Sequence, residues 1–217
     1  MTIKATLEKF VTFYNALSSY EKARFEKRVD DFILSKNFIA KGNLKEVSEE
    51  IKILVASAAV MTTFGFEEIH FGHYSDILVY PDKFFSNYSN GEQISEVNPD
   101  GAIVFSWKDL ASGFLIPDDG NNIGINCFMR AIVIENTLKR NSILDARFLG
   151  KWQAVADKEY ERIMQNNMWP DKGKFERKDF FAITAEYFFE KPEILRNGHP
   201  VLLSAFSDLI NQKPKEA

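Results

Sequence analysis

The stretch of sequence that decides the fold is NNIGINCFMRAIVIEN, which runs from Asn121 to Asn136. Apolar residues occur around nearly the whole circumference of the helix that it would form, which predicts a helix buried in the core. Asn126, Cys127 and Arg130 interrupt this apolar surface. Asn126 and Arg130 are four residues apart and share one helical face, with Cys127 beside them. These three residues are therefore the first candidates for a functional site.

The composition is that of a globular protein with a substantial core. The chain has 217 residues, of which 45% are hydrophobic, enough for one sizeable domain. Its formal net charge is -4 and no basic cluster occurs, so we do not expect a nucleic acid as a direct partner. The N-terminal residues mix Lys4, Glu8 and Lys9 with apolar side chains, which argues against a signal peptide or membrane span. With a single cysteine and so no internal disulfide, the sequence predicts a cytoplasmic protein that does not associate with membranes.

Periodicity and turn signals divide the chain into helices and a small sheet. Residues 3–38 predict two amphipathic helices joined at Ser18-Ser19, and we expect residues 1–42 to form a helical N-terminal extension of one domain spanning residues 1–217. A further helix follows Gly42-Asn43 and ends at Gly65. The runs DILVYP and AIVFSW predict strands of a mixed or antiparallel sheet, separated by a polar loop at 86–100. Later helices are expected at 122–139, 143–168, 177–190 and 200–211.

Four sequence motifs resemble those of the Mlc titration factor A family. They are VYPDKFF at 79–85, GAIVFSWKDL at 101–110, NIGINCFMRAI at 122–132 and DFFAITAEYFFEKPEIL at 179–195. The last motif is the most specific, because a chance match over so many positions is improbable. The resemblance implies an α+β zincin-like fold, mostly helical, in which the active-site helix lies across the small sheet. It also implies a zinc-dependent, aminopeptidase-like activity for the family.

The zinc-binding motif of that family, H-E-x-x-H, is degenerate in this chain. By resemblance, the two zinc-binding histidines fall on Asn126 and Arg130, the catalytic glutamate falls on Cys127, and a third ligand falls on Glu186. A zinc peptidase needs ligands that lower the pKa of a bound water and a carboxylate that takes its proton. Asparagine is a poor zinc ligand, and arginine stays protonated. We therefore predict that the protein binds no zinc or other cofactor and has no peptidase activity.

The retained Glu186 needs another source of positive charge if it is buried without a metal. We predict that Arg130 supplies it through a two-pronged hydrogen-bonded pair, and that Asn126 satisfies a remaining lone pair of Glu186. The structural alternative is that Asn126 and Arg130 face solvent and that Cys127 is a small buried thiol.

Three functional hypotheses follow from these residues. The first is a non-catalytic pseudo-peptidase that acts inside the cell through protein–protein binding. The namesake of the family binds a glucose-responsive transcriptional repressor, so the resemblance implies a transcriptional regulator as one possible partner. The second is a metal-dependent aminopeptidase or other hydrolase with relocated ligands, for example Cys127 and Glu186 with His70 or His73. The third is a structural or toxin-neutralising partner that forms one tight complex.

Overall fold

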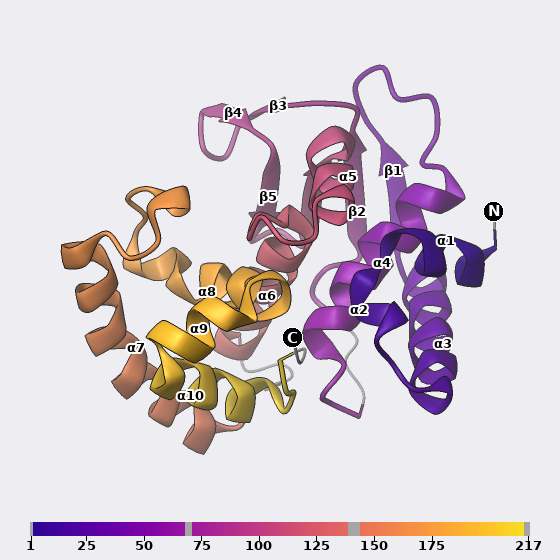
Figure 1. The fold of residues 1–217 in the computed structure, drawn as a ribbon. Helices are drawn as coiled ribbons and strands as arrows, with labels where there is room; N and C mark the ends of the chain where they lie inside the picture. The colour runs from indigo at the N-terminus through magenta and orange to yellow at the C-terminus, as the bar shows by residue number, and fades with distance from the viewer. Residues whose placement is uncertain (1, 68–70, 139–143, 215–217) are drawn as a thin grey trace.

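A four-stranded mixed sheet organises the fold, and the computed structural model describes residues 2–67, 71–138 and 144–214 (Figure 1). The strand order is β1-β2-β6-β5. β1 pairs parallel with β2 and β2 parallel with β6, whereas β5 pairs antiparallel with β6. A separate antiparallel hairpin joins β3 and β4. The strands are β1 Asn37–Ala40, β2 Asp76–Tyr80, β3 Phe84–Ser86, β4 Gly91–Gln93, β5 Ser95–Asn98 and β6 Ala102–Ser106.

The sheet is the mixed alternative of the sequence prediction, and the antiparallel alternative is wrong. The two predicted strands, β2 and β6, lie side by side in parallel, with Ile77 opposite Ile103. The polar loop predicted at 86–100 is also wrong, because it contains β4 and β5. The antiparallel partner of β6 is β5. β5 could not be predicted as a strand, because its segment is rich in turn-forming residues.

Helices make up most of the remaining chain, and α6 lies between two groups of them. Figure 1 shows α1 to α4 on one side of α6 and α7, α9 and α10 on the other. The helices are α1 Ile3–Phe10, α2 Thr12–Asn15, α3 Ser19–Ser35, α4 Glu49–Thr63, α5 Trp107–Leu115, α6 Ile123–Thr137, α7 Ala146–Asn166, α8 Phe180–Glu190, α9 Pro192–Gly198 and α10 Pro200–Ile210, with short 3-10 turns η1 Pro170–Lys172 and η2 Arg177–Asp179. Each helix predicted from Gly42 onward corresponds to a helix of the structure, although the first begins only at Glu49. The predicted bounds at 139 and 143 lie outside the described residues.

Side-chain caps explain where several of these helices begin. Ser18 forms a capping box with Glu21 at the start of α3, and the Ser48 hydroxyl accepts from the Ile51 amide at the start of α4. Asn122 caps α6, since its Oδ1 accepts from the amides of Gly124 and Ile125. This cap fixes the backbone at the N-terminus of α6.

The prediction of a helical N-terminal extension over residues 1–42 is wrong for its last residues. Residues 37–40 form β1, whose residue Phe38 pairs with Ile77 of β2. Leu7 of α1 and Phe25 of α3 are fully buried and belong to the common hydrophobic core. The N-terminal residues are therefore an integral part of the sheet and the core.

Small residues bring α4 and α6 close together. α4 is buried over most of its length, and Gly124 lies in the first turn of α6. A Cβ atom placed on Gly124 would lie 2.8 Å from the Cβ of Ala58, which is closer than packed side chains allow. The N-terminus of α6 is consequently held against α4.

The end of α10 closes against the end of α4. Asn211 Nδ2 donates to Gly65 O at 2.7 Å, and Gln212 Nε2 donates to Met61 O at 3.1 Å. A Cβ atom on Gly65 would lie 2.3 Å from the carbonyl oxygen of Ile210, so this contact requires glycine. Asn211 and Gln212, which lie far from α4 in the sequence, thus cover one edge of the core.

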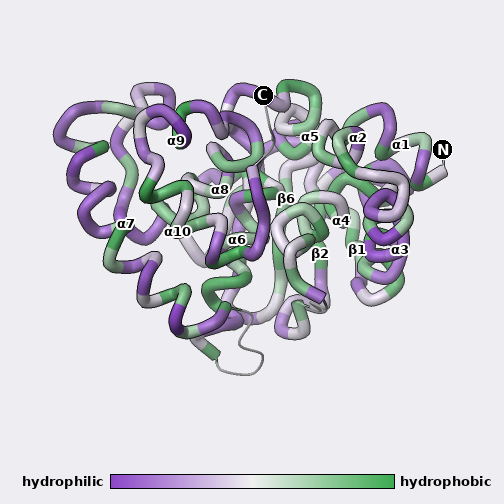
Figure 2. The backbone as a smooth tube through the Cα atoms, turned by 60° about the horizontal axis from the view of Figure 1, so that its bottom comes forward, coloured by the Kyte–Doolittle hydropathy of each residue, from purple (hydrophilic) through white to green (hydrophobic). Residues whose placement is uncertain are grey.

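The outer helices alternate in polarity along their length. In Figure 2, α7 carries hydrophilic residues interrupted by hydrophobic ones, and α3 is predominantly hydrophilic. This alternation is typical of helices with one face on the core and one in water. Within the three described ranges, no helix combines the length and the apolar character needed to cross a bilayer.

Candidate functional site

The candidate site centres on Glu186, which α8 places against the N-terminal turns of α6. Glu186 is 4% exposed in a helix whose other residues are mostly apolar. Its Oε1 accepts from the backbone N–H of Asn122 at 2.9 Å. Its Oε2 accepts from Asn126 Nδ2 at 3.3 Å and from Lys172 Nζ at 2.8 Å. Both carboxylate oxygens are therefore satisfied by groups of the protein.

The cation of this site is Lys172, not Arg130. Lys172 ends the 3-10 turn η1, and its ammonium also donates to Asn121 Oδ1 at 2.9 Å. The side chains of Lys172 and Glu186 are only 9% and 5% exposed, so their ion pair is buried. Among the described residues, no ion pair joins Arg130 to Glu186, and that prediction is wrong. The predicted contact between Asn126 and Glu186 is confirmed.

Burial and hydrogen bonding act on Glu186 in opposite directions. Burial raises the pKa of the Glu186 carboxyl above its usual range, because the charged form loses its hydration. The ammonium of Lys172 is the strongest opposing influence, and the donors on Asn122 and Asn126 add to it. The charged form of Glu186 thus depends on Lys172.

The turn that carries Lys172 is anchored by aromatic and ionic contacts. Trp169 stacks on Tyr187 of α8 with 4.4 Å between ring centroids and an interplanar angle of 17°. Asp171 accepts from Tyr187 Oη at 2.5 Å and from Lys191 Nζ at 2.9 Å. Burial opposes ionisation of Asp171, but these two donors outweigh it and lower the pKa of the carboxyl. Lys172 is therefore held at Glu186 by the anchored residues that precede it in the turn.

Cys127 lies on another face of α6 and contacts the sheet. It is completely buried, and burial raises the pKa of its thiol to about 11, partly opposed by a hydrogen bond with Ser95 of β5 and by the charge of Arg130. Arg130 itself is half-buried. The buried-thiol alternative is thus confirmed for Cys127, whose sulfur is covered and carries little thiolate near neutral pH.

Cys127 should react slowly with thiol reagents. At mildly alkaline pH we expect labelling of the folded protein to be at least about 100-fold slower than labelling of the unfolded chain, because little thiolate exists and the sulfur is covered. Stopped-flow absorbance with an aromatic disulfide reagent, with and without denaturant, measures this ratio. Equal rates in both states would contradict the buried position.

The relocated metal site proposed as an alternative does not assemble in the described part of the chain. His73 donates its backbone N–H to Glu135 Oε1 at 2.8 Å, and its Nε2 lies 2.6 Å from Pro99 O. Glu135 follows Cys127 by eight residues, which is about 12 Å along α6. His70 lies outside the described residues. Over the described ranges, no group of three histidine, cysteine or carboxylate side chains converges on one point.

Comparison with known proteins assigns the chain to a family. A family model described as glucose-regulated metallo-peptidase M90 matches residues 1–209. The chain belongs to this family. An uncharacterized protein of Synechocystis sp. is 23% identical over an alignment of 224 residues including gaps, and the match covers 90% of this chain and 78% of the relative. The resemblance to the Mlc titration factor A family and the α+β zincin-like fold are both confirmed.

The residues of this M90 family member do not fit the zinc ion that its family uses. At the positions that the motif resemblance assigns to the zinc ligands stand the amide of Asn126, the guanidinium of Arg130 and the carboxylate of Glu186. The carboxylate oxygen nearest to Asn126 already accepts from an ammonium at 2.8 Å, and a zinc ion could not share that place. We therefore derive no catalytic step through a metal.

Lys172 is the residue of this site that the sequence analysis does not identify. It lies in the polar segment WPDKGKF, which carries no periodic signal. The need for such a residue could be inferred from chemistry alone, because a buried carboxylate without a metal requires a cation from elsewhere in the chain.

Proposed function

We propose that this M90 family member is a non-catalytic pseudo-peptidase that acts through protein–protein binding. The supporting observation is the buried ion pair between Lys172 and Glu186. In a zinc peptidase the corresponding carboxylate binds the metal that activates water. Here it binds an ammonium, which can neither lower the pKa of a water as a metal does nor polarise a substrate carbonyl with comparable strength.

The proposal also assigns a structural role to the former ligand positions. Asn126 donates to Glu186 from α6, and Lys172 donates to it from η1. The ion pair and the Asn126 hydrogen bond thereby link α6, α8 and η1, as a metal would link its ligands. We infer that the fold is retained for binding, with a cytoplasmic protein as partner, and that a transcriptional regulator belongs to the class of partners to be tested first.

Metal content separates this function from a hydrolase with relocated ligands. The protein, purified without a metal-binding tag, should retain less than about a tenth of an equivalent of zinc after loading and desalting, because Glu186 is already paired. It should also leave short unblocked peptides uncleaved. Mass spectrometry of the metal and chromatography of the peptides provide the two readouts.

A restored variant is the matched control. Combining Asn126→His, Cys127→Glu and Arg130→His with Lys172→Ala recreates the ligand set and removes the competing cation, so this variant should bind about one equivalent of zinc. If the wild-type protein itself loads about one equivalent and cleaves the peptides, the hydrolase alternative is correct and the proposal is wrong.

A further inference from the structure

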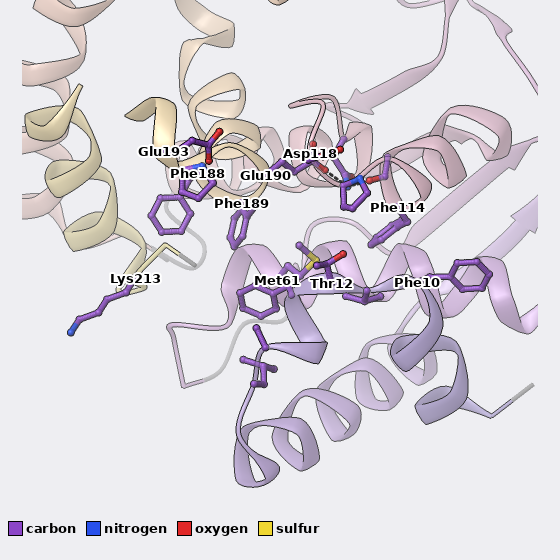
Figure 3. Close-up of a pocket in the computed structure, with 18 of the residues that line it drawn as sticks. Phe10, Thr12, Met61, Phe114, Asp118, Phe188, Phe189, Glu190, Glu193 and Lys213 are labelled. Atoms are coloured by element: carbon purple, nitrogen blue, oxygen red, sulfur yellow. Dashed lines mark hydrogen bonds between the residues drawn. The ribbon is translucent and has the colours of Figure 1, made fainter. Parts of the chain in front are cut away.

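An apolar groove of about 810 Å³ lies between the N-terminal helices and the C-terminal end of α8. The groove is separate from the Lys172–Glu186 ion pair, although Asn122 contributes to both. Figure 3 shows Met61 and Thr12 on one wall, with Glu190 and Asp118 on the opposite wall. Its largest apolar lining residues are Phe10, Phe13, Met61, Phe114, Phe188 and Phe189.

The charged side chains of the groove are predominantly acidic. Glu21, Asp118, Glu190 and Glu193 line it, whereas the lining residue with a basic side chain is Lys213. Figure 3 shows Lys213 extending away from the other lining residues. An acidic segment would be repelled here, and a cation would be attracted.

Glu190 is the most deeply placed of these carboxylates and has an unused hydrogen-bonding atom. Its Oε1 accepts from Asn122 Nδ2 at 3.1 Å. Its Oε2 is covered by neighbouring atoms and accepts no hydrogen bond of ordinary geometry from the described residues, although the Gly120 amide lies close enough to lower the pKa of the carboxyl. Leaving a buried carboxylate oxygen unpaired is costly, so this atom favours a ligand that brings a donor.

We propose that the groove binds a segment of a partner protein in which a lysine or arginine side chain lies between apolar side chains. The apolar side chains pack against the aromatic lining, and the cation pairs with Glu190. This inference rests on the proposed binding function and specifies the chemistry of the partner.

The protonation state of Glu190 supplies an independent readout. Burial raises its pKa to about 8, and the charges of Asp119 and Glu186 act in the same direction, whereas Asn122 and the Gly120 amide oppose the rise. The other carboxylates of the groove are Glu21, Asp118 and Glu193. A bound cation favours the charged form of Glu190, so binding releases a proton near neutral pH and strengthens as pH rises towards about 8.

A random peptide library tests the groove directly. Acetylated, amidated peptides of about six residues, which span ~20 Å when extended, are selected on the full-length protein. We expect lysine or arginine to be enriched at one position between apolar residues. Glu190→Gln should weaken a selected peptide by at least about tenfold, as for loss of a charge-assisted hydrogen bond, and should remove the pH dependence. Glu92→Gln, in the exposed part of β4, is the matched control and should change neither.

Melting curves of both variants check that they fold. Selection of no consensus or of an acidic one would overturn the inference, as would equal affinity in wild type and Glu190→Gln. A pH dependence that persists in Glu190→Gln would also overturn it, because another group would then carry the linkage. The zinc measurement is unaffected by any of these results, so the groove can fail while the non-catalytic assignment stands.

Discussion

Replacing Lys172 by methionine lowers the free energy of unfolding by about 3–5 kcal/mol, the usual effect of leaving one charge of a buried pair without its partner. Methionine keeps most of the volume of the lysine stem, so little of this loss arises from a cavity. Of its hydrogen-bond donors in the described part of the chain, Glu186 would then retain those on Asn122 and Asn126. Urea unfolding followed by circular dichroism measures the change.

The pH dependence of this loss identifies its electrostatic cause. Without Lys172, burial holds the pKa of Glu186 still further above the value of 4.5 that it has in the unfolded chain. A carboxyl whose folded pKa is raised binds its proton more tightly in the folded state, so folding is favoured as pH falls. The deficit of Lys172→Met should therefore be largest at alkaline pH and shrink as pH falls through the raised pKa of Glu186.

The double variant Lys172→Met with Glu186→Gln is the control. It removes both charges, and we expect it to recover a large part of the stability that Lys172→Met loses. Glu186→Gln alone should also destabilise the protein, by a smaller amount, because the lysine stem can carry its ammonium towards water. A Lys172→Met variant as stable as the wild type at every pH would show that the ion pair has no structural role.

Replacing Trp169 by alanine should cost about 3–5 kcal/mol, as is usual for truncating a buried aromatic side chain. Trp169 is 2% exposed and stacks on Tyr187, and its ring also contacts Phe180 at 5.5 Å between centroids. Part of the loss should arise from Lys172, which follows in the same turn and depends on it for position. Chemical unfolding of the variant gives the total.

Two comparisons separate the packing contribution of Trp169 from its effect on the position of Lys172. Trp169→Phe keeps an aromatic ring and removes the indole N–H, which has no hydrogen-bond partner among the described residues, so its cost should be well below that of alanine. In the background of Glu186→Gln, Trp169→Ala should cost less than in the wild type, because the ion pair is already absent. Additive losses would mean that Trp169 does not position Lys172.

The helical part of the fold could be predicted from sequence because its signals are local. Ser18 and Ser48 precede apolar residues at helical spacing, and both serve as caps in the structure. β1 could not be predicted, because four partly exposed residues after a long helix carry almost no periodic signal. Its pairing with β2 joins residues almost forty positions apart, and only the assembled core specifies it.

The candidate site could be predicted only where sequence motifs on helices specify it. Asn126 and Glu186 were placed together correctly, since a motif on one helix and a motif on a later helix carry this information. Helical spacing predicts Arg130 as the cation, because Arg130 shares a helical face with Asn126. The choice between Arg130 and Lys172 depends on how the segment after Trp169 folds back, and an irregular turn leaves no pattern in the sequence.

The contact between α10 and the end of α4 has a consequence for the kinetics of folding. The hydrogen bonds from Asn211 to Gly65 and from Gln212 to Met61 join residues that are 146 and 151 positions apart in the sequence. Contacts of such high sequence separation form late, because a long loop must lose its freedom before they stabilise anything. During synthesis, the N-terminal helices and β1 leave the ribosome before the residues that cover one edge of their core have been made. The apolar surface at that edge is exposed during this interval, which is when the chain is most prone to aggregation and to chaperone binding.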